Sequence, residues 1–164
     1  MKRFSIFNNL KDHELEYFRQ VTKAIHIKVG EEFIREGELG DSIFLLVDGT
    51  IEINQALTLP LSKRGNDNRE KSIVQLSHKL SPPPFFGEMT LFDDNAKRTA
   101  NIKALTDCYL MQIMKDDLFD ICDTHMETGY KVMQNISSVL CKKLVTANTN
   151  VLKLTTAFSL VLER

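Results

Sequence analysis

The chain has 164 residues, of which 43% are hydrophobic and 26% are charged, which suits one globular domain with an appended helix. The formal net charge of −1 excludes a global electrostatic attraction to nucleic acid or to an acidic membrane. No apolar run approaches a membrane span. The three cysteines show neither metal-ligand spacing nor a disulfide framework, so a cytoplasmic protein is expected.

The first elements along the chain are predicted to be a helix followed by short strands. Residues 4–24 carry apolar side chains at helical spacing, and Asn8 or Asn9 can cap the start of this helix. From Ile25 onward, short apolar runs are separated by glycines, as in strands joined by tight turns. Such regular spacing predicts a sandwich or jelly roll. The runs lie at residues 25–29, 33–34, 42–47 and 51–53.

A polar stretch and three prolines follow these strands. Residues 55–72 contain turn formers and mixed charges without apolar spacing, which predicts an exposed hairpin loop. A nucleic-acid patch is the alternative, but acidic residues interrupt the basic ones and no aromatic residue is interleaved. Residues 72–80 are a further strand candidate, and the prolines at 82–84 should hold the chain extended after it. Two closing strands are predicted at 102–104 and 108–113.

The stretch FFGEMTLFDDNAKRTAN, which follows the prolines, carries residues suited to bind an anion. Gly87 lets a ligand approach the backbone closely. Residues 88–91 favour a helical turn whose first N–H groups would form an anion site. Arg98 has the guanidinium that forks onto phosphate oxygens, Thr99 adds a hydroxyl, and Ala100 leaves space beside it. The alternative is that the arginine forms a surface ion pair with the acidic residues before it.

Glu88 repels phosphate, so a sugar hydroxyl is its natural partner, and the set suits a ligand with phosphate and ribose close together. Here the chain resembles the cyclic nucleotide-binding domain family, because FGEM followed by RTA is similar to that family's phosphate-binding cassette. The resemblance implies that Glu88 accepts from the ribose 2′-hydroxyl and that Arg98 pairs with the cyclic phosphate of cyclic AMP or cyclic GMP. Thr99 would meet phosphate or base. The implied cassette contacts are Gly87, Glu88, Met89, Thr90, Arg98, Thr99 and Ala100.

Two helices are predicted after the strands. The acidic start of residues 116–122 favours a short helix. Residues 128–162 lack proline, and their apolar residues recur with alternating steps of four and three, which predicts a long helix with a coiled-coil stripe. A second apolar set can face the strands. The stripe is Leu140, Leu144, Ala147, Val151, Leu154, Phe158 and Val161, and the second set is Val132, Ile136, Val139 and Leu152.

The length of the stripe favours a parallel homodimer, since a monomer would expose an apolar patch; the alternative is that the stripe packs inside one subunit. In catabolite activators of the same family this helix pairs two subunits and covers the nucleotide. By that resemblance, Asn148 would meet the purine edge. Those activators continue into a DNA-binding domain that has no counterpart before Arg164, so no nucleic acid is expected to bind this chain.

The expected fold is mainly β with α, a jelly roll or β-roll with an N-terminal helix over residues 1–127 and a C-terminal lid and dimerisation helix over 128–164. The histidines are scattered, and no catalytic triad, Walker loop or dinucleotide fingerprint occurs, so neither a metal nor catalytic residues are expected. The expected function is a non-enzymatic cyclic nucleotide sensor that signals to an unidentified effector. The alternatives are a ligand-free dimeric scaffold and the sensor part of a transcription regulator.

Overall fold

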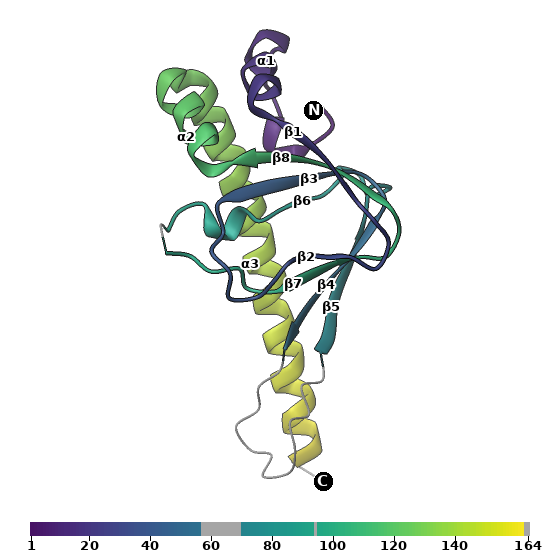
Figure 1. Ribbon diagram of the computed structural model, residues 1–164. Helices are drawn as coiled ribbons and strands as arrows, with labels where there is room; N and C mark the ends of the chain where they lie inside the picture. Colours follow the sequence, from purple (N-terminus) through teal and green to yellow (C-terminus); the bar gives the residue numbers. More distant parts are fainter. Residues whose placement is uncertain (57–69, 94, 163–164) are drawn as a thin grey trace.

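The computed structural model describes residues 1–56, 70–93 and 95–162. Two antiparallel four-stranded sheets face each other, with strand orders β1-β8-β3-β6 and β2-β7-β4-β5, and the helices lie outside them (Figure 1). This arrangement confirms the predicted mainly β roll with helices. The strands are β1 (Lys23–Ile27), β2 (Glu32–Ile34), β3 (Ser42–Asp48), β4 (Thr50–Ala56), β5 (Glu70–Ser77), β6 (Phe85–Phe86), β7 (Asn101–Ala104) and β8 (Cys108–Met114). The helices are α1 (Asp12–Val21), α2 (Lys115–Thr124) and α3 (Met126–Leu162), with the 3₁₀ turns η1 (Ser5–Phe7) and η2 (Glu88–Thr90).

Strand β3 explains why the molecule has two apolar cores. Successive side chains of a strand point to opposite faces, so Ile43 and Leu45 enter the core between the first sheet and the helices. Phe44 and Leu46 enter the core between the two sheets. The apolar run in this part of the sequence therefore serves two layers at once.

The predicted N-terminal helix over residues 4–24 forms only in part. The chain makes the short turn η1, then takes a positive φ of 64° at Asn9, and α1 begins at Asp12. The expected asparagine cap is therefore wrong. Glu14 supplies the cap instead, because its Oε2 accepts from the backbone N–H of Lys11 at 2.6 Å. The predicted hairpin loop lies mostly outside the described residues, although β4 and β5 on either side of it pair antiparallel.

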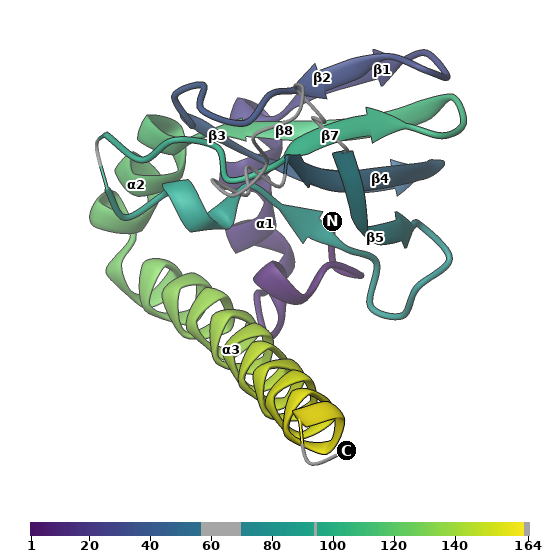
Figure 2. The same ribbon diagram turned by 90° about the horizontal axis from the view of Figure 1, so that it is seen from below.

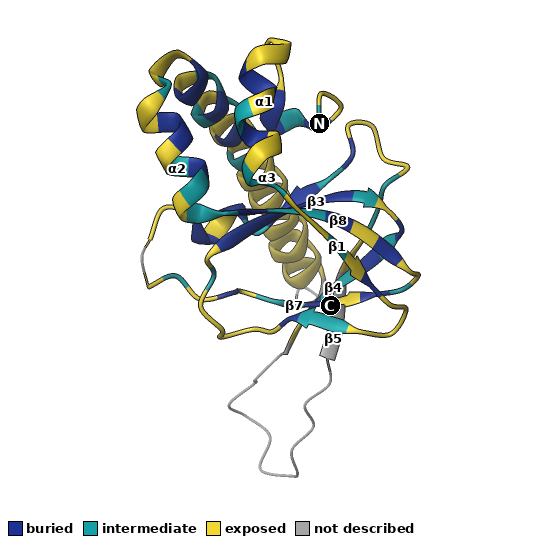
Figure 3. Ribbon diagram, turned by 45° about the horizontal axis from the view of Figure 1, so that its top comes forward, coloured by how far each residue is buried: buried dark blue, intermediate teal, exposed yellow. Residues whose placement is uncertain are grey.

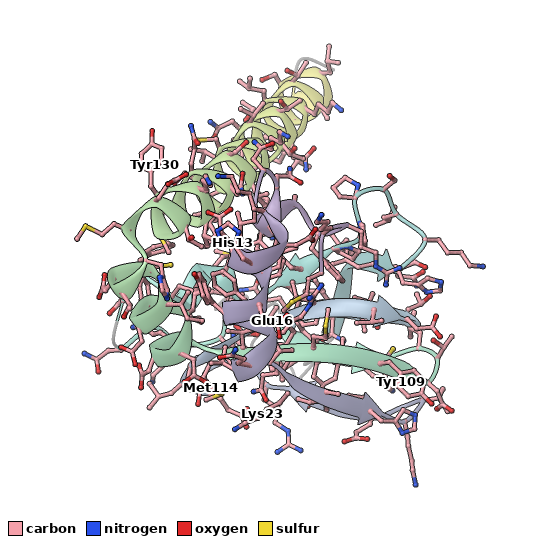
Figure 4. The ribbon with its side chains drawn as sticks, turned by 90° about the horizontal axis from the view of Figure 1, so that it is seen from above. His13, Glu16, Lys23, Tyr109, Met114 and Tyr130 are labelled. Carbon is pink, nitrogen blue, oxygen red and sulfur yellow. The ribbon has the colours of Figure 1, made fainter. Side chains whose placement is uncertain are left out.

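Helix α3 is buried only in its first turns. It runs beside the two sheets and projects beyond them (Figures 1 and 2). Val132 and Ile136 are fully buried in the core beneath α1 and α2, whereas Tyr130 points outward (Figure 4). Leu152, which was expected to face the strands, is 68% exposed, so that part of the prediction is wrong. The predicted domain boundary at residue 128 falls inside this helix and stays a prediction.

A buried ion pair ties α3 to α1. The carboxylate of Glu14 accepts from Thr128 Oγ1 at 3.0 Å and from Lys131 Nζ at 2.9 Å. Burial alone would raise the pKa of Glu14, but hydrogen bonds from the Lys11 backbone, Lys131 and Thr128 lower it from 4.5 to about 2. The carboxylate is therefore ionised near neutral pH, and it fixes the position at which α3 leaves the core.

The distal part of α3 exposes the predicted coiled-coil stripe (Figure 3). Its described large apolar side chains beyond Leu140 are each at least 60% exposed. Leu140 itself packs partly against the core. No helix in the described part of the chain combines the length and apolarity that crossing a bilayer requires. The exposed large apolar members of the stripe are Leu144, Val151, Leu154 and Phe158, and Ala147 is exposed as well.

Candidate functional site

A cavity lies between the β-roll and α3. It is lined by residues from β2, β4, β6, β7, the turn η2 and the segment that follows it, and by one residue of α3. Its walls combine aliphatic side chains with two buried charged groups of opposite sign. The lining residues are Ile34, Ile53, Phe86, Gly87, Glu88, Met89, Thr90, Arg98, Thr99, Ala100, Ile102 and Lys143.

The shape of the cavity depends on a glycine. Gly87 has a φ of 89° and precedes η2, so the predicted short helical turn forms as a 3₁₀ turn. A Cβ at this position would lie 2.8 Å from both Arg98 Nη1 and the carbonyl oxygen of Ser42. Glycine is therefore required for two reasons, the left-handed backbone and the close approach of the arginine. Within the turn, the N–H of Thr90 donates to the carbonyl oxygen of Gly87. The backbone N–H groups that come before Thr90 in the turn are therefore available to a ligand.

Arg98 is the buried cation of the site. Its side chain is 7% exposed, and its guanidinium donates to Thr90 Oγ1 at 3.3 Å and to Ser42 Oγ at 3.2 Å. The nearest described carboxylate, that of Asp41, is 3.9 Å from Nη2, which is beyond hydrogen-bond distance. Burial lowers the pKa of Arg98, while the carboxylates of Asp41 and Glu38 oppose that shift. The direct hydrogen-bond partners of this buried guanidinium among the described residues are thus neutral hydroxyl groups, with the Asp41 carboxylate just beyond hydrogen-bond distance.

Glu88 is the buried anion of the site, with 1% exposure. Its Oε1 accepts from Lys143 Nζ of α3 at 2.7 Å, and the lysine side chain is half-exposed. This ion pair connects the long helix directly to the cassette. Within the described part of the chain, no group of three His, Cys, Asp or Glu side chains is arranged to hold a metal ion.

The structure brings together the cassette residues that the sequence predicted, but not Asn148. That residue is exposed on α3 and does not line the cavity. Lys143, five residues earlier, lines it instead. Sequence reasoning missed this lysine because the phase of a helix relative to a pocket depends on packing elsewhere. It also missed Ile34, Ile53 and Ile102, although their alternation within apolar strands could have indicated an inward face.

The cavity therefore combines the guanidinium of Arg98, the backbone turn that begins at Gly87 and the buried carboxylate of Glu88 with aliphatic side chains. A model of the cyclic nucleotide-binding domain matches residues 24–125, more than half of the chain. The chain belongs to the cyclic nucleotide-binding domain family. The matched span of this cyclic nucleotide-binding domain contains all the cassette residues, and α3 begins just beyond it. Domains of this family are in general regulatory.

Relatives of this cyclic nucleotide-binding domain have different overall architectures. It is 32% identical over 106 residues to cGMP-dependent protein kinase, isozyme 1, of Drosophila melanogaster, covering 65% of this chain and 12% of the kinase. It is 25% identical over 147 residues to glutaminase 2 of Bradyrhizobium diazoefficiens, covering 90% of this chain and 21% of the glutaminase. The chain thus spans about a fifth or less of each of these two curated relatives.

The catabolite activator protein of Thermus thermophilus is a structural neighbour of the domain. The two match with a TM-score of 0.74 and 20% identity, covering 92% of this chain and 63% of the activator chain. At this identity the likeness shows the fold alone. The matched part of this chain includes most of α3, because the residues outside α3 make up much less than 92% of the chain.

Proposed function

We propose that this domain is a sensor of a cyclic purine nucleotide, cyclic AMP or cyclic GMP, and that it signals through α3. The observation that carries the proposal is the buried guanidinium of Arg98, which faces the cavity with no described carboxylate at hydrogen-bond distance. A cyclic phosphate carries one negative charge and two free oxygens. It would supply an anion at hydrogen-bond distance and accept hydrogen bonds from the guanidinium N–H groups. The N–H groups at the start of η2 would hold the remaining phosphate contacts.

The ribose would lie next to Glu88. A buried carboxylate accepts hydrogen bonds and cannot donate them when ionised, so it favours a sugar hydroxyl over a phosphate oxygen. Ile34, Ile53 and Ile102 offer an apolar surface to the rest of the ligand. Thr99 and Ala100 line the same cavity, and the hydroxyl of Thr99 suits either phosphate or base.

Signalling would begin at Lys143. In this structure Lys143 donates to the Glu88 carboxylate, and a ribose 2′-hydroxyl would compete for the same carboxylate. Binding would therefore weaken one contact between α3 and the cassette and shift the population of α3 positions. A helix that carries an exposed apolar stripe is a suitable output element, because a change in its position changes which surface a partner meets.

The partner of the stripe is proposed to be a second copy of the chain. The steps of four and three along α3 suit a two-stranded parallel coiled coil, and the exposed side chains of Leu154 and Phe158 would be buried in it. In such a dimer Asn148 would be free to reach a purine edge. An effector protein would then recognise the ligand-dependent state. Cys141 is an exposed free thiol, which fits a reducing compartment such as the cytoplasm.

Calorimetric titration with cyclic AMP and cyclic GMP tests the proposal. Arg98→Ala should weaken binding by about a hundredfold, because it removes hydrogen bonds to a charged group that contribute about 1.5–3 kcal/mol each. Arg19→Ala is the matched control, since Arg19 lies on α1 and pairs only with Glu16 at 2.8 Å among the described residues. No heat and no melting shift with either nucleotide at millimolar concentration would refute the sensor. The exposed stripe would then favour a dimeric scaffold.

A second candidate is that the sensor is part of a transcription regulator, since the matched fold accounts for only 63% of the Thermus thermophilus activator chain. Both candidates require the same ligand site. They differ in whether a DNA-binding segment is joined to the sensor in the complete gene product, which the length of the reading frame decides.

A further inference from the structure

We infer that Thr90 is a positioning residue for Arg98, because its hydroxyl fixes one edge of the guanidinium against the turn η2, and that Gly40 is a glycine to leave room for Thr90. This role differs from the direct ligand contact that the cassette resemblance implies for Thr90. Gly40 lies in the loop between β2 and β3 and does not line the cavity. The inference rests on the proposed function only where it concerns nucleotide affinity.

The hydroxyl of Thr90 has one arrangement that satisfies both of its neighbours. Thr90 is 2% exposed, and its Oγ1 lies 3.0 Å from the carbonyl oxygen of Gly87 and 3.3 Å from Arg98 Nη1. A carbonyl oxygen only accepts hydrogen bonds, and a guanidinium nitrogen only donates them. The hydroxyl proton therefore points to Gly87, and a lone pair of the same oxygen faces the arginine.

The two terminal nitrogens of Arg98 are held by different elements. Nη2 lies beside the start of β3, where it donates to Ser42 Oγ at 3.2 Å and pairs with the Asp41 carboxylate at 3.9 Å. Nη1 lies against η2, where Thr90 Oγ1 is its hydrogen-bond partner among the described residues. The hydroxyl of Thr90 thus connects the guanidinium to the turn that lines the cavity beside it. The orientation of the arginine relative to this wall therefore depends on Thr90.

Gly40 provides the space that the Thr90 side chain occupies. A Cβ at residue 40 would lie 2.4 Å from Thr90 Oγ1 and 2.6 Å from both its Cβ and its Cγ2, which is far inside van der Waals contact. The φ of Gly40 lies outside the left-handed range that favours glycine, so the backbone alone does not require a glycine here. The close approach of Thr90 does.

The loop that carries Gly40 is also fastened to the cassette at the arginine. The N–H of Gly37 donates to the carbonyl oxygen of Arg98 at 2.9 Å. The N–H of Arg98 donates in turn to the carbonyl oxygen of Glu38 at 2.7 Å. One loop therefore holds the backbone of the arginine and packs against Thr90, which holds its side chain.

The first test compares crystal structures without a ligand. Thr90→Val replaces the hydroxyl by a methyl group that can neither donate nor accept, so Nη1 of Arg98 should turn away from residue 90. Thr90→Ser keeps the hydroxyl, and the guanidinium should stay where it is. An unchanged guanidinium in Thr90→Val would overturn the inference, whether or not the protein binds a nucleotide. Thermal melting verifies that both variants are folded.

The second test measures cyclic AMP affinity by calorimetry. Thr90→Val should weaken binding about tenfold, because the arginine loses a partner that aims it, whereas Thr90→Ser should stay within about twofold of the wild type. If Thr90 served only to pack its methyl group, the order of the two variants would be reversed, and that result would overturn the inference. Thr22→Val is the matched control and should leave binding unchanged. Thr22 Oγ1 also donates to a carbonyl oxygen, that of Phe18 at 2.6 Å, but it does not line the cavity.

Gly40→Ala tests the same contact from the other side. Its methyl group should displace the Thr90 side chain and weaken cyclic AMP binding about tenfold. Thr90→Gly removes all three atoms that this methyl group would meet, so adding Gly40→Ala to Thr90→Gly should cost no more than about twofold. A tenfold loss in both backgrounds would show that residue 40 acts independently of Thr90, and the inference would be wrong. This comparison does not depend on the folding of Thr90→Val.

The tests separate the possible failures. If the wild-type protein binds neither cyclic AMP nor cyclic GMP, the proposed function fails, and the crystal structures still decide whether Thr90 holds Arg98. If the wild-type protein binds but Thr90→Val binds equally well, the proposed function stands and the positioning role is refuted.

Discussion

Replacing Lys143 by methionine tests how the ligand site is coupled to α3. The substitution keeps a long flexible side chain but removes the ammonium group that lies 2.7 Å from Glu88 Oε1. Glu88 is almost fully buried, whereas the lysine side chain is 51% exposed. Exposed ion pairs contribute about 0.2–1 kcal/mol, and hydrogen bonds to charged groups about 1.5–3 kcal/mol. Discounted for the solvent around the lysine, the pair contributes about 1 kcal/mol, or a factor of about five in affinity.

The direction of the effect follows from competition. A ribose 2′-hydroxyl must displace Lys143 to reach Glu88, so Lys143→Met should tighten cyclic AMP binding about fivefold. A 2′-deoxy analogue offers no hydroxyl to Glu88, and its affinity should stay nearly the same. Calorimetry with both ligands on both proteins therefore measures the coupling directly. The preference for the ribose form should increase about fivefold in the variant.

Lys142→Met is the matched control, because Lys142 carries the same charge on the same helix turn but is exposed and does not line the cavity. It should leave both affinities unchanged. Weaker cyclic AMP binding by Lys143→Met would refute the reasoning and make the lysine a ligand contact. An unchanged preference between the ribose and deoxyribose forms would also refute it, since Glu88 would then not be shared.

Three further predictions concern stability and assembly. Glu14→Gln should lower the free energy of unfolding by about 2 kcal/mol at neutral pH, because hydrogen bonds to a charged carboxylate are weakened. The folded pKa of Glu14 is depressed, so its stabilising contribution is present above pH 4.5 and is lost as the pH falls toward about 2. In acid titrations followed by circular dichroism, the difference in stability between the wild type and Glu14→Gln should therefore shrink over this pH range. Gly129→Ala should destabilise the protein in denaturant titrations although alanine favours helices, because its Cβ would lie 2.5 Å from the carbonyl oxygen of Cys122; a variant as stable as wild type would contradict this packing. Sedimentation should show a dimer that Leu154→Glu with Phe158→Glu converts to monomer without lowering the melting of the β-roll, and a wild-type monomer would refute the coiled coil.

Much of the fold could be predicted because its determinants are local. The alternation of apolar residues and the spacing of glycines indicated the strands, and β3 and β8 occupy nearly the expected ranges. The positive φ of Gly87 follows from the same local rule. The exposed end of α3 was predicted from its heptad spacing. The start of the N-terminal helix was the main error, because a turn and a positive φ at Asn9 interrupt a pattern that periodicity alone predicts to be one continuous helix.

The contacts that tune the site could not be predicted in this way. Lys143 meets Glu88 across 55 positions, and Ser42 meets Arg98 across 56. The first contact depends on where α3 leaves the core and in which rotation, which the buried pair of Glu14 and Lys131 helps to set. The second depends on the β-roll bringing the start of β3 beside the cassette.

The sequence by itself determined the chemistry that is available, namely a glycine that opens the backbone, an arginine, a glutamate and a long amphipathic helix. Only the tertiary structure decided which groups hold that chemistry in place. Residue types and spacings specify local conformation through backbone and side-chain preferences that act over a few positions. The partner of a buried charge is chosen by packing among elements far apart in the chain, and that choice made Lys143, and not Asn148, the α3 residue at the cavity.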